Sequence, residues 1–131
     1  MTADVSPSRP DLEGLERSVQ PIEVVVMELR NLLGARLVAY IGSVGETRVV
    51  DQWADGERAV GSEDKAIRLR AALHVAVLLG EHDTPEVIQA WFQGLNPQLA
   101  DRSPARFLRE GDIAEVGPMV LTAARAFASE G

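Results

Sequence analysis

The most continuous apolar pattern of the chain lies between Lys65 and Gly80, in the segment KAIRLRAALHVAVLLG. The segment starts with charged side chains, becomes apolar on every side from Ala71 to Leu79, and is rich in strong helix formers. A helix that is apolar all round is buried in a membrane or in a protein core. Because this run is shorter than the roughly 20 apolar residues that span a bilayer, it predicts a central core helix with Ser62 as its N-cap.

The segments before the central helix carry apolar residues on one side only. Residues 21–33 repeat apolar positions at i, i+3, i+4 and i+7, which predicts an amphipathic helix, although the β-branched run Val24–Val26 is a competing strand signal. Ala35–Ile41 predicts a short second helix, or with less support a strand, and Glu46–Ala54 predicts a third helix with Trp53 in the core. This order resembles a helix-turn-helix, in which the later helix carries the DNA-facing side chains.

The segments after the central helix begin with two clear start signals. Thr84-Pro85 and Ser103-Pro104 each place a capping side chain before a proline in the first turn, and a loop, LNPQLADR, separates the two predicted helices. A terminal helix is predicted from about Gly117 to Ala128, with Pro118 in its first turn or at a kink.

These patterns predict an all-α protein in three parts. Residues 1–20 hold prolines, serines and few apolar positions, and predict a disordered N-terminal segment. Residues 21–61 form a helix-turn-helix-like unit. Residues 62–131 hold the central helix, which both halves share, and a C-terminal helical binding subdomain.

Charge and composition narrow the class of protein. The net charge is −7, and residues 1–65 carry 12 acidic against 7 basic side chains, so bulk charge does not favour nucleic acid. The absence of cysteine excludes disulfides and thiolate chemistry. No basic start followed by an apolar run marks a signal peptide, so a cytoplasmic protein is expected.

No residue pattern specifies a catalytic or metal site. His74 lies in the most apolar stretch and is interpreted as a core histidine, and His82 has no second spaced histidine that would make a metal site. Ser43 lies in GSVG, which is neither a nucleophile elbow nor a phosphate loop. The sequence therefore predicts a protein that is not an enzyme and needs no cofactor.

Three stretches, TRVVDQWADGE, RLRAALHVAVLL and VIQAWFQGLNPQLADRSPARFLREG, together carry a family resemblance. In this order the chain resembles the Xre/ParS/MbcA-type antitoxins from about Leu29 to its end, most specifically over Trp91–Gly111. The resemblance implies a helix-turn-helix-like domain joined to a toxin-binding domain, and a RES-domain, NAD-consuming toxin as the partner. It also implies that the chain forms homodimers or hetero-oligomers with the toxin. Some members of the family repress their own operon.

The resemblance implies that the C-terminal segment reaches toward the active-site cleft of the toxin. Adjacent Trp91 and Phe92 point about 100° apart on a helix, so one is expected in the core and the other at an interface, with the assignment open. Arginines 102, 106 and 109 are interpreted first as a solvated face, with an interface role as the alternative. The candidate toxin-binding residues are Trp91, Phe92, Asn96, Arg109, Phe127, Ser129, Glu130 and Gly131.

DNA binding is the main alternative function. By position, the candidate base-reading residues are Thr47, Arg48 and Gln52, which a solvated helix face also explains. Acidic side chains surround Arg48, the single base of this helix, so DNA binding by a lone monomer is not expected. Two alternatives to the antitoxin stay open: a stand-alone DNA-binding regulator of the Xre type, and a helical adaptor for another partner.

Overall fold

A computed structural model describes the backbone of residues 9–130 and the side chains of residues 12–130. Within this range the chain forms eight α-helices, one short 3-10 helix and no strand, which confirms the predicted all-α class. The elements are α1 (Arg9–Ser18), α2 (Ile22–Leu33), α3 (Ala35–Ile41), α4 (Thr47–Ala54), α5 (Glu63–Leu79), α6 (Pro85–Gln93), η1 (Pro97–Leu99), α7 (Pro104–Glu110) and α8 (Ile113–Glu130).

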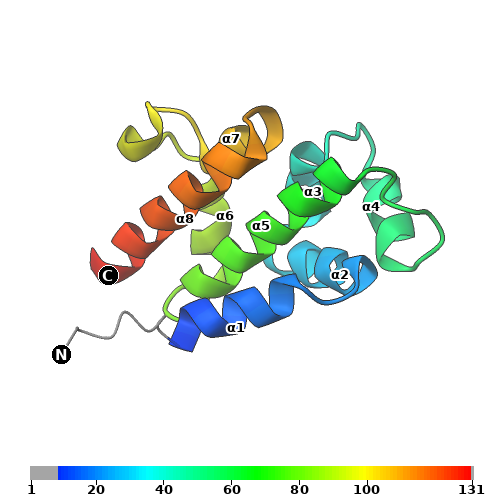
Figure 1. The fold of residues 1–131 in the computed structure, drawn as a ribbon, viewed down its shortest axis with the longest axis horizontal. Helices are drawn as coiled ribbons and strands as arrows, with labels where there is room; N and C mark the ends of the chain where they lie inside the picture. The colour runs from blue at the N-terminus through cyan, green and yellow to red at the C-terminus, as the bar shows by residue number, and fades with distance from the viewer. Residues whose placement is uncertain (1–8, 131) are drawn as a thin grey trace.

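Helix α5 is the central element of the fold, as its apolar pattern predicts. The Ser62 Oγ accepts a hydrogen bond of 3.1 Å from the Lys65 backbone N–H and caps its first turn. In Figure 1, α5 runs diagonally across the molecule, with α1 on one side and α8 on the other, and both pack against it. Helix α2 also packs against α5, so neighbours surround most of its circumference.

Helices α2, α3 and α4 pack on one another and form the first half of the fold. Arg30 Nη1 lies 2.9 Å from Asp51 Oδ1 and joins α2 to α4. Trp53 is 2% exposed, which confirms that it belongs to the core, and its ring packs against Gly42 at the end of α3.

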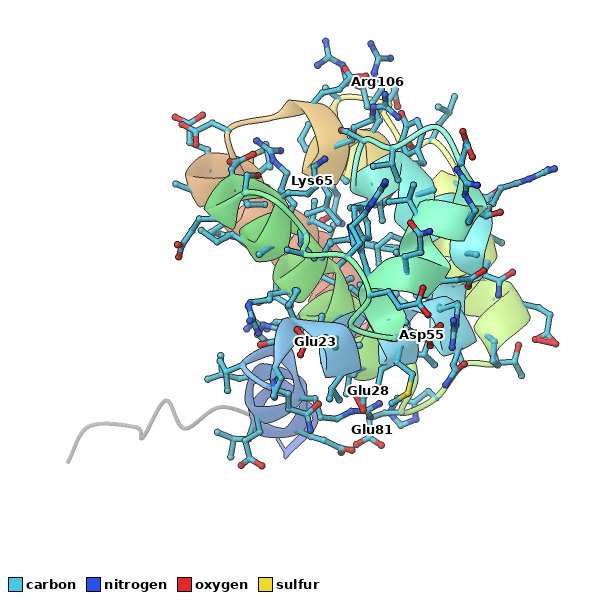
Figure 2. All side chains as sticks on the ribbon, turned by 90° about the vertical axis from the view of Figure 1, so that its right-hand side faces the viewer. Glu23, Glu28, Asp55, Lys65, Glu81 and Arg106 are labelled. Atoms are coloured by element: carbon cyan, nitrogen blue, oxygen red, sulfur yellow. The ribbon has the colours of Figure 1, made fainter. Side chains whose placement is uncertain are left out.

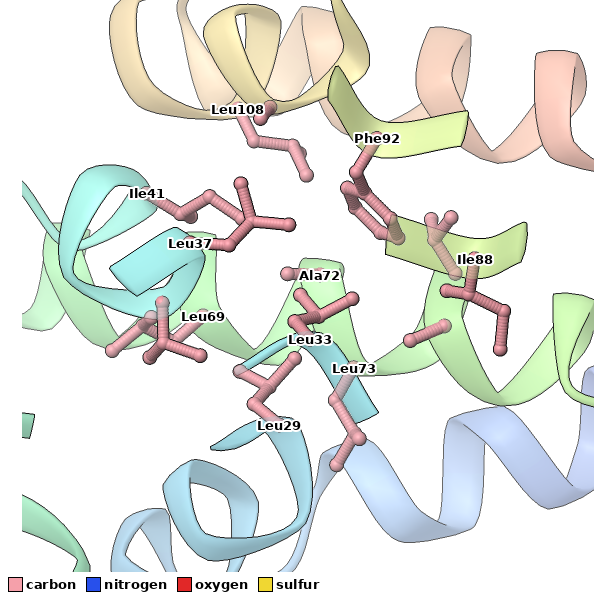
Figure 3. Close-up of a cluster of buried hydrophobic side chains, with 14 of the residues drawn as sticks. Leu29, Leu33, Leu37, Ile41, Leu69, Ala72, Leu73, Ile88, Phe92 and Leu108 are labelled. Atoms are coloured by element: carbon pink, nitrogen blue, oxygen red, sulfur yellow. The ribbon is translucent and has the colours of Figure 1, made fainter. Parts of the chain in front are cut away.

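A single apolar core joins the two halves of the chain. Figure 3 shows leucine, isoleucine and phenylalanine side chains from α2, α3, α5, α6 and α7 pointing into the same space. The labelled members are Leu29, Leu33, Leu37, Ile41, Leu69, Ala72, Leu73, Ile88, Phe92 and Leu108. The shared core means that the position of the later helices depends on the earlier ones.

The prediction of a disordered segment over residues 1–20 is wrong for Arg9–Ser18, which form α1, while residues 1–8 lie outside the described part. Helix α1 packs on α5 through two small residues, Gly14 and Ser18, which are buried. The Arg70 side chain donates hydrogen bonds to the backbone oxygens of Ser18 and Gln20. The sequence pattern did not indicate this packing because the buried side of α1 is small rather than apolar.

Close packing at Gly14 leads to a testable prediction. A Cβ atom at this position would lie 2.7 Å from His74 Cδ2 and 2.9 Å from the His74 backbone oxygen, so Gly14→Ala overpacks the contact between α1 and α5. We expect the overpacking to lower the free energy of unfolding by about 1–3 kcal/mol. The better helix propensity of alanine opposes this loss with roughly 1 kcal/mol. Urea denaturation measures it. The matched control, Gly45→Ala, meets no atom within 4 Å and should change little; equal effects would contradict the close contact.

The terminal helix begins earlier than predicted. Helix α8 starts at Ile113 rather than near Gly117, because the Asp112 Oδ1 accepts a hydrogen bond of 3.2 Å from the Ala114 N–H and caps the first turn. Pro118 lies inside the helix. A proline removes only one backbone donor, and the N–H groups of Glu115 and Val116 in the first turn donate hydrogen bonds to the Asp112 backbone oxygen.

Candidate protein-binding surface

Helix α6 divides its apolar side chains between the core and the surface. The Thr84 Oγ1 accepts a hydrogen bond of 3.4 Å from the Val87 N–H, and Pro85 occupies the first turn, as the sequence predicts. Ile88 and Phe92, one turn apart, are 1% and 0% exposed. Phe92 is therefore the core member of the aromatic pair, which removes it from the candidate binding residues.

Trp91 lies on the outer side of α6 and is only half-buried. Its ring packs edge-to-face on Phe92 with centroids 5.4 Å apart, and lies 6.3 Å from the ring of Phe127 on α8. Val87, one turn earlier, is 39% exposed. We call Val87, Trp91 and Phe127 the Trp91 surface. Two ring contacts hold the indole in place, so it can serve as an interface anchor that loses little side-chain freedom on binding.

An acidic groove begins where the Trp91 surface reaches the end of α8. The groove has a volume of about 250 Å³ and lies between the α5–α6 loop and the last turn of α8. Its lining residues are His82, Asp83, Phe127, Ala128 and Glu130. Phe127 belongs to both features, so an apolar anchor and two carboxylates lie side by side.

Three lining residues of this groove, His82, Asp83 and Ala128, are not among the predicted binding residues. The sequence presents His82 only as a possible metal ligand. His82 and Asp83 meet α8 through the three-dimensional fold and not through sequence spacing. Val87 was likewise not predicted, although its position four residues before Trp91 places both on one helix face.

Three of the predicted toxin-binding residues, Ser129, Glu130 and Gly131, belong to the C-terminal end of the chain. Ser129 and Glu130 are exposed at the end of α8, where the Ser129 Oγ donates a hydrogen bond of 3.0 Å to the Ala126 backbone oxygen. Gly131 lies outside the described residues. Phe127, Ser129 and Glu130 therefore lie together with the Trp91 surface or directly beyond it.

Asn96 has a structural role in the loop that follows α6. Its side-chain Oδ1 accepts a hydrogen bond of 2.9 Å from the Gln98 N–H, and its backbone N–H donates one of 3.1 Å to the Arg102 oxygen. Leu99 anchors the same loop in the core at 1% exposure. The Asn96 side chain, which is predicted to bind the toxin, thus caps the short helix η1.

Arg109 is engaged within the fold, away from the Trp91 surface. Its guanidinium carbon lies 4.6 Å from the centre of the Tyr40 ring, and its Nη1 donates a hydrogen bond of 3.1 Å to the Tyr40 backbone oxygen. It joins α7 to α3. The neighbouring Arg106 is exposed and pairs with Glu110, and Figure 2 shows it at the opposite end of the molecule from Glu28 and Glu81.

The outer face of α4 holds the three candidate base-reading residues. Thr47 and Arg48 are exposed, and Arg48 lies 3.4 Å from a Glu46 carboxylate oxygen. Gln52 is half-buried, with an Oε1 that has no hydrogen-bond partner among the described residues. The single base of this face is thus beside an acid, which does not favour contact with phosphates.

Further observations and comparisons add no chemical site. Among residues 12–130, whose side chains the structure describes, no three histidine, aspartate or glutamate side chains gather in a way that could hold a metal ion. In the same part of the chain, no helix combines the length and apolar content that crossing a membrane requires. No protein-family model, curated protein or solved structure matches the chain.

Proposed function

We propose that the chain is the antitoxin of a type II toxin–antitoxin system, which binds a RES-domain toxin and inhibits its consumption of NAD. The chain acts through protein–protein contact in a hetero-oligomer, with no catalysis and no cofactor of its own. The proposal is supported by the sequence resemblance and by one structural observation, the half-buried Trp91 beside Phe127 at the edge of an acidic groove.

The charge of the groove fits the proposed target. A cleft that binds a dinucleotide presents cationic groups to its phosphates, and Asp83 and Glu130 would meet such groups with opposite charge. Trp91 and Phe127 would supply the apolar centre of the interface, and interfaces of this kind bury at least about 1,200 Å² in total. The pairing of Arg48 of α4 with Glu46, the residue before this helix, gives DNA binding less support.

The test measures NAD consumption by a RES-domain protein encoded beside the gene for this chain. The chain should suppress the reaction, and Trp91→Glu should weaken the inhibition roughly 30-fold or more, the effect of losing an interface anchor of about 2 kcal/mol. Trp91→Phe keeps an aromatic ring and should retain most of the inhibition.

The matched control is Met27→Glu, which places the same charge at an exposed apolar position of α2. It should inhibit like the wild type. Absence of binding and inhibition by the wild-type chain would overturn the proposed function. Equal inhibition by the Trp91→Glu and wild-type chains would show that the toxin contacts another surface.

A further inference from the structure

Three basic side chains converge on one small pocket at the start of α5. Lys65 and Arg68 come from the first two turns of this helix, and Arg109 comes from the end of α7. The pocket has a volume of about 190 Å³, and each of the three cations is partly buried. We call it the Lys65 pocket, and its polar lining residues are Ser43, Ser62, Asp64, Lys65, Arg68 and Arg109.

The fold holds both arginines of the pocket in place. The Arg68 Nε and Nη2 donate hydrogen bonds of 2.7 and 3.4 Å to the two Asp64 carboxylate oxygens, and its Nη1 donates one of 2.8 Å to the Leu108 backbone oxygen. The Arg109 guanidinium lies over the Tyr40 ring and donates one hydrogen bond to the Tyr40 backbone oxygen. A ligand that meets these groups therefore orders little that is not already ordered.

Positive charge exceeds negative charge in the Lys65 pocket. Asp64 is the one acidic lining residue, and it pairs with Arg68. Among the described residues, no carboxylate pairs with Lys65 or Arg109, and the Lys65 Nζ has only the Trp53 ring near it, at 5.8 Å from the ring centre. Three cations and one carboxylate leave a net charge of +2 on the lining, in a chain whose net charge is −7.

Two hydroxyl groups add neutral donors to the cations. The Ser62 Oγ accepts the hydrogen bond from the Lys65 N–H that caps α5, and its own proton stays available to a ligand. Ser43 is exposed in the loop between α3 and α4, and its Oγ makes no hydrogen bond to the described residues. Apart from Asp64, the polar side chains of the pocket can therefore all donate to an anion.

We propose that the Lys65 pocket binds a phosphate dianion, as free inorganic phosphate or as the terminal phosphoryl group of a small molecule. A phosphoryl group carries about −1.5 to −2 charges at pH 7, which matches the net charge of the lining. Lysine and arginine are the side chains that recognise phosphate oxygens. The volume lies below the roughly 300–1,000 Å³ of sites that enclose a drug-sized ligand, so the pocket takes one phosphoryl group and not a whole nucleotide.

The acidic character of the chain does not prevent this binding. Figure 2 shows Lys65 and Arg106 in one half of the molecule, and Glu28 and Glu81 in the other. At physiological ionic strength, exposed charges farther apart than about 8 Å are largely screened from each other. An anion at the Lys65 pocket therefore responds mainly to the lining residues.

This inference goes beyond the proposed function and does not depend on it. The Lys65 pocket lies between α3, α5 and α7, and it shares no lining residue with the acidic groove at the end of α8. Binding of phosphate and inhibition of a toxin can therefore be tested separately.

The test titrates the full chain with inorganic phosphate at constant ionic strength and follows the backbone amides by NMR. We expect saturable shifts around Ser43 and Ser62, with a dissociation constant on the order of 1 mM. Lys65→Gln removes a charge-assisted hydrogen bond, so it should weaken binding roughly tenfold or more. The matched control is Arg106→Gln, which removes the same charge from an exposed residue outside the pocket and should bind phosphate like the wild type.

Asp64→Asn tests the sign of the effect. It removes the negative charge of the lining, and its amide oxygen can still accept a hydrogen bond from Arg68, so phosphate binding should tighten roughly two- to fivefold. General loss of structure cannot tighten binding, which keeps the test valid if Lys65→Gln unfolds. Unchanged or weaker binding in Asp64→Asn would contradict the proposal.

Glycerol phosphate distinguishes the two sources of the ligand. Tighter binding than that of inorganic phosphate would assign the pocket to a phosphorylated small molecule, and equal or weaker binding would assign it to free phosphate. Shifts that do not saturate, or equal weakening by Lys65→Gln and Arg106→Gln, would overturn the proposal. Duplex DNA that binds through Lys65 while inorganic phosphate does not bind would also overturn it, since the pocket would then recognise a phosphodiester.

Discussion

Replacement of Phe92 by alanine is expected to lower the free energy of unfolding by about 3–5 kcal/mol. The side chain is 0% exposed and belongs to the core cluster that Figure 3 shows with Ile88 and Leu108. Removing the ring leaves a cavity between helices from both halves of the chain, which cannot close without moving them. Because domains are stable by only about 5–15 kcal/mol, this loss is a large part of the total. Urea denaturation followed by circular dichroism measures it.

Trp91→Ala is the control for this prediction, because it removes a larger ring from the neighbouring position. The half-buried indole should contribute about 1–2 kcal/mol, less than the fully buried phenyl ring. Trp91→Ala should therefore lower the free energy of unfolding by less than Phe92→Ala does. A greater loss of stability in Trp91→Ala than in Phe92→Ala would show that the two faces of α6 are assigned in reverse.

Helix starts could be predicted from the sequence because they depend on local chemistry. Ser62, Thr84 and Ser103 each accept a hydrogen bond from the backbone N–H three residues later, at 3.1, 3.4 and 3.1 Å. A capping side chain followed by an acid or a proline is enough to specify this geometry. The helices α5, α6 and α7 accordingly begin where the sequence places them.

Helix α1 and the start of α8 could not be predicted because their stabilising contacts are not apolar patterns. Gly14 and Ser18 allow close approach of two helices, a role that depends on the partner helix and not on hydrophobicity. In α8, Pro118 indicated a helix boundary, whereas capping by Asp112 starts the helix one turn earlier. Both differences arise where tertiary contact or capping outweighs local propensity.

The candidate binding surface was only partly predictable, for a reason visible in α6. Two apolar doublets give this helix a wide apolar stripe, and the sequence does not say which half faces the core. The rotation of the helix is fixed by long-range contacts, among them the hydrogen bond of 3.1 Å that the Gln89 Nε2 donates to the Leu32 backbone oxygen. The engagement of Arg109 by Tyr40 is equally non-local, and it separates a predicted binding residue from the Trp91 surface.

Trp53→Ala is expected to cost about 3–5 kcal/mol of the free energy of unfolding, and to loosen α4 first. Trp53 is the largest apolar side chain of α4 and is 2% exposed. Its ring packs so closely on α3 that a Cβ atom at Gly42 would lie 2.9 Å from two of its carbons. The Lys65 ammonium lies 5.8 Å from the centre of the same ring, so the indole also joins α4 to the start of α5.

Hydrogen exchange distinguishes this effect from general destabilisation. In Trp53→Ala the amides of Thr47–Ala54 should lose protection before those of α6, because Trp53 holds α4 against α3 whereas α6 packs on α2 and α7. Trp53→Phe keeps an aromatic ring over Gly42 and should cost less than the alanine variant. Simultaneous loss of protection in α4 and α6 would mean that the two halves unfold as one unit, and that the shared core outweighs the contact between Trp53 and α3.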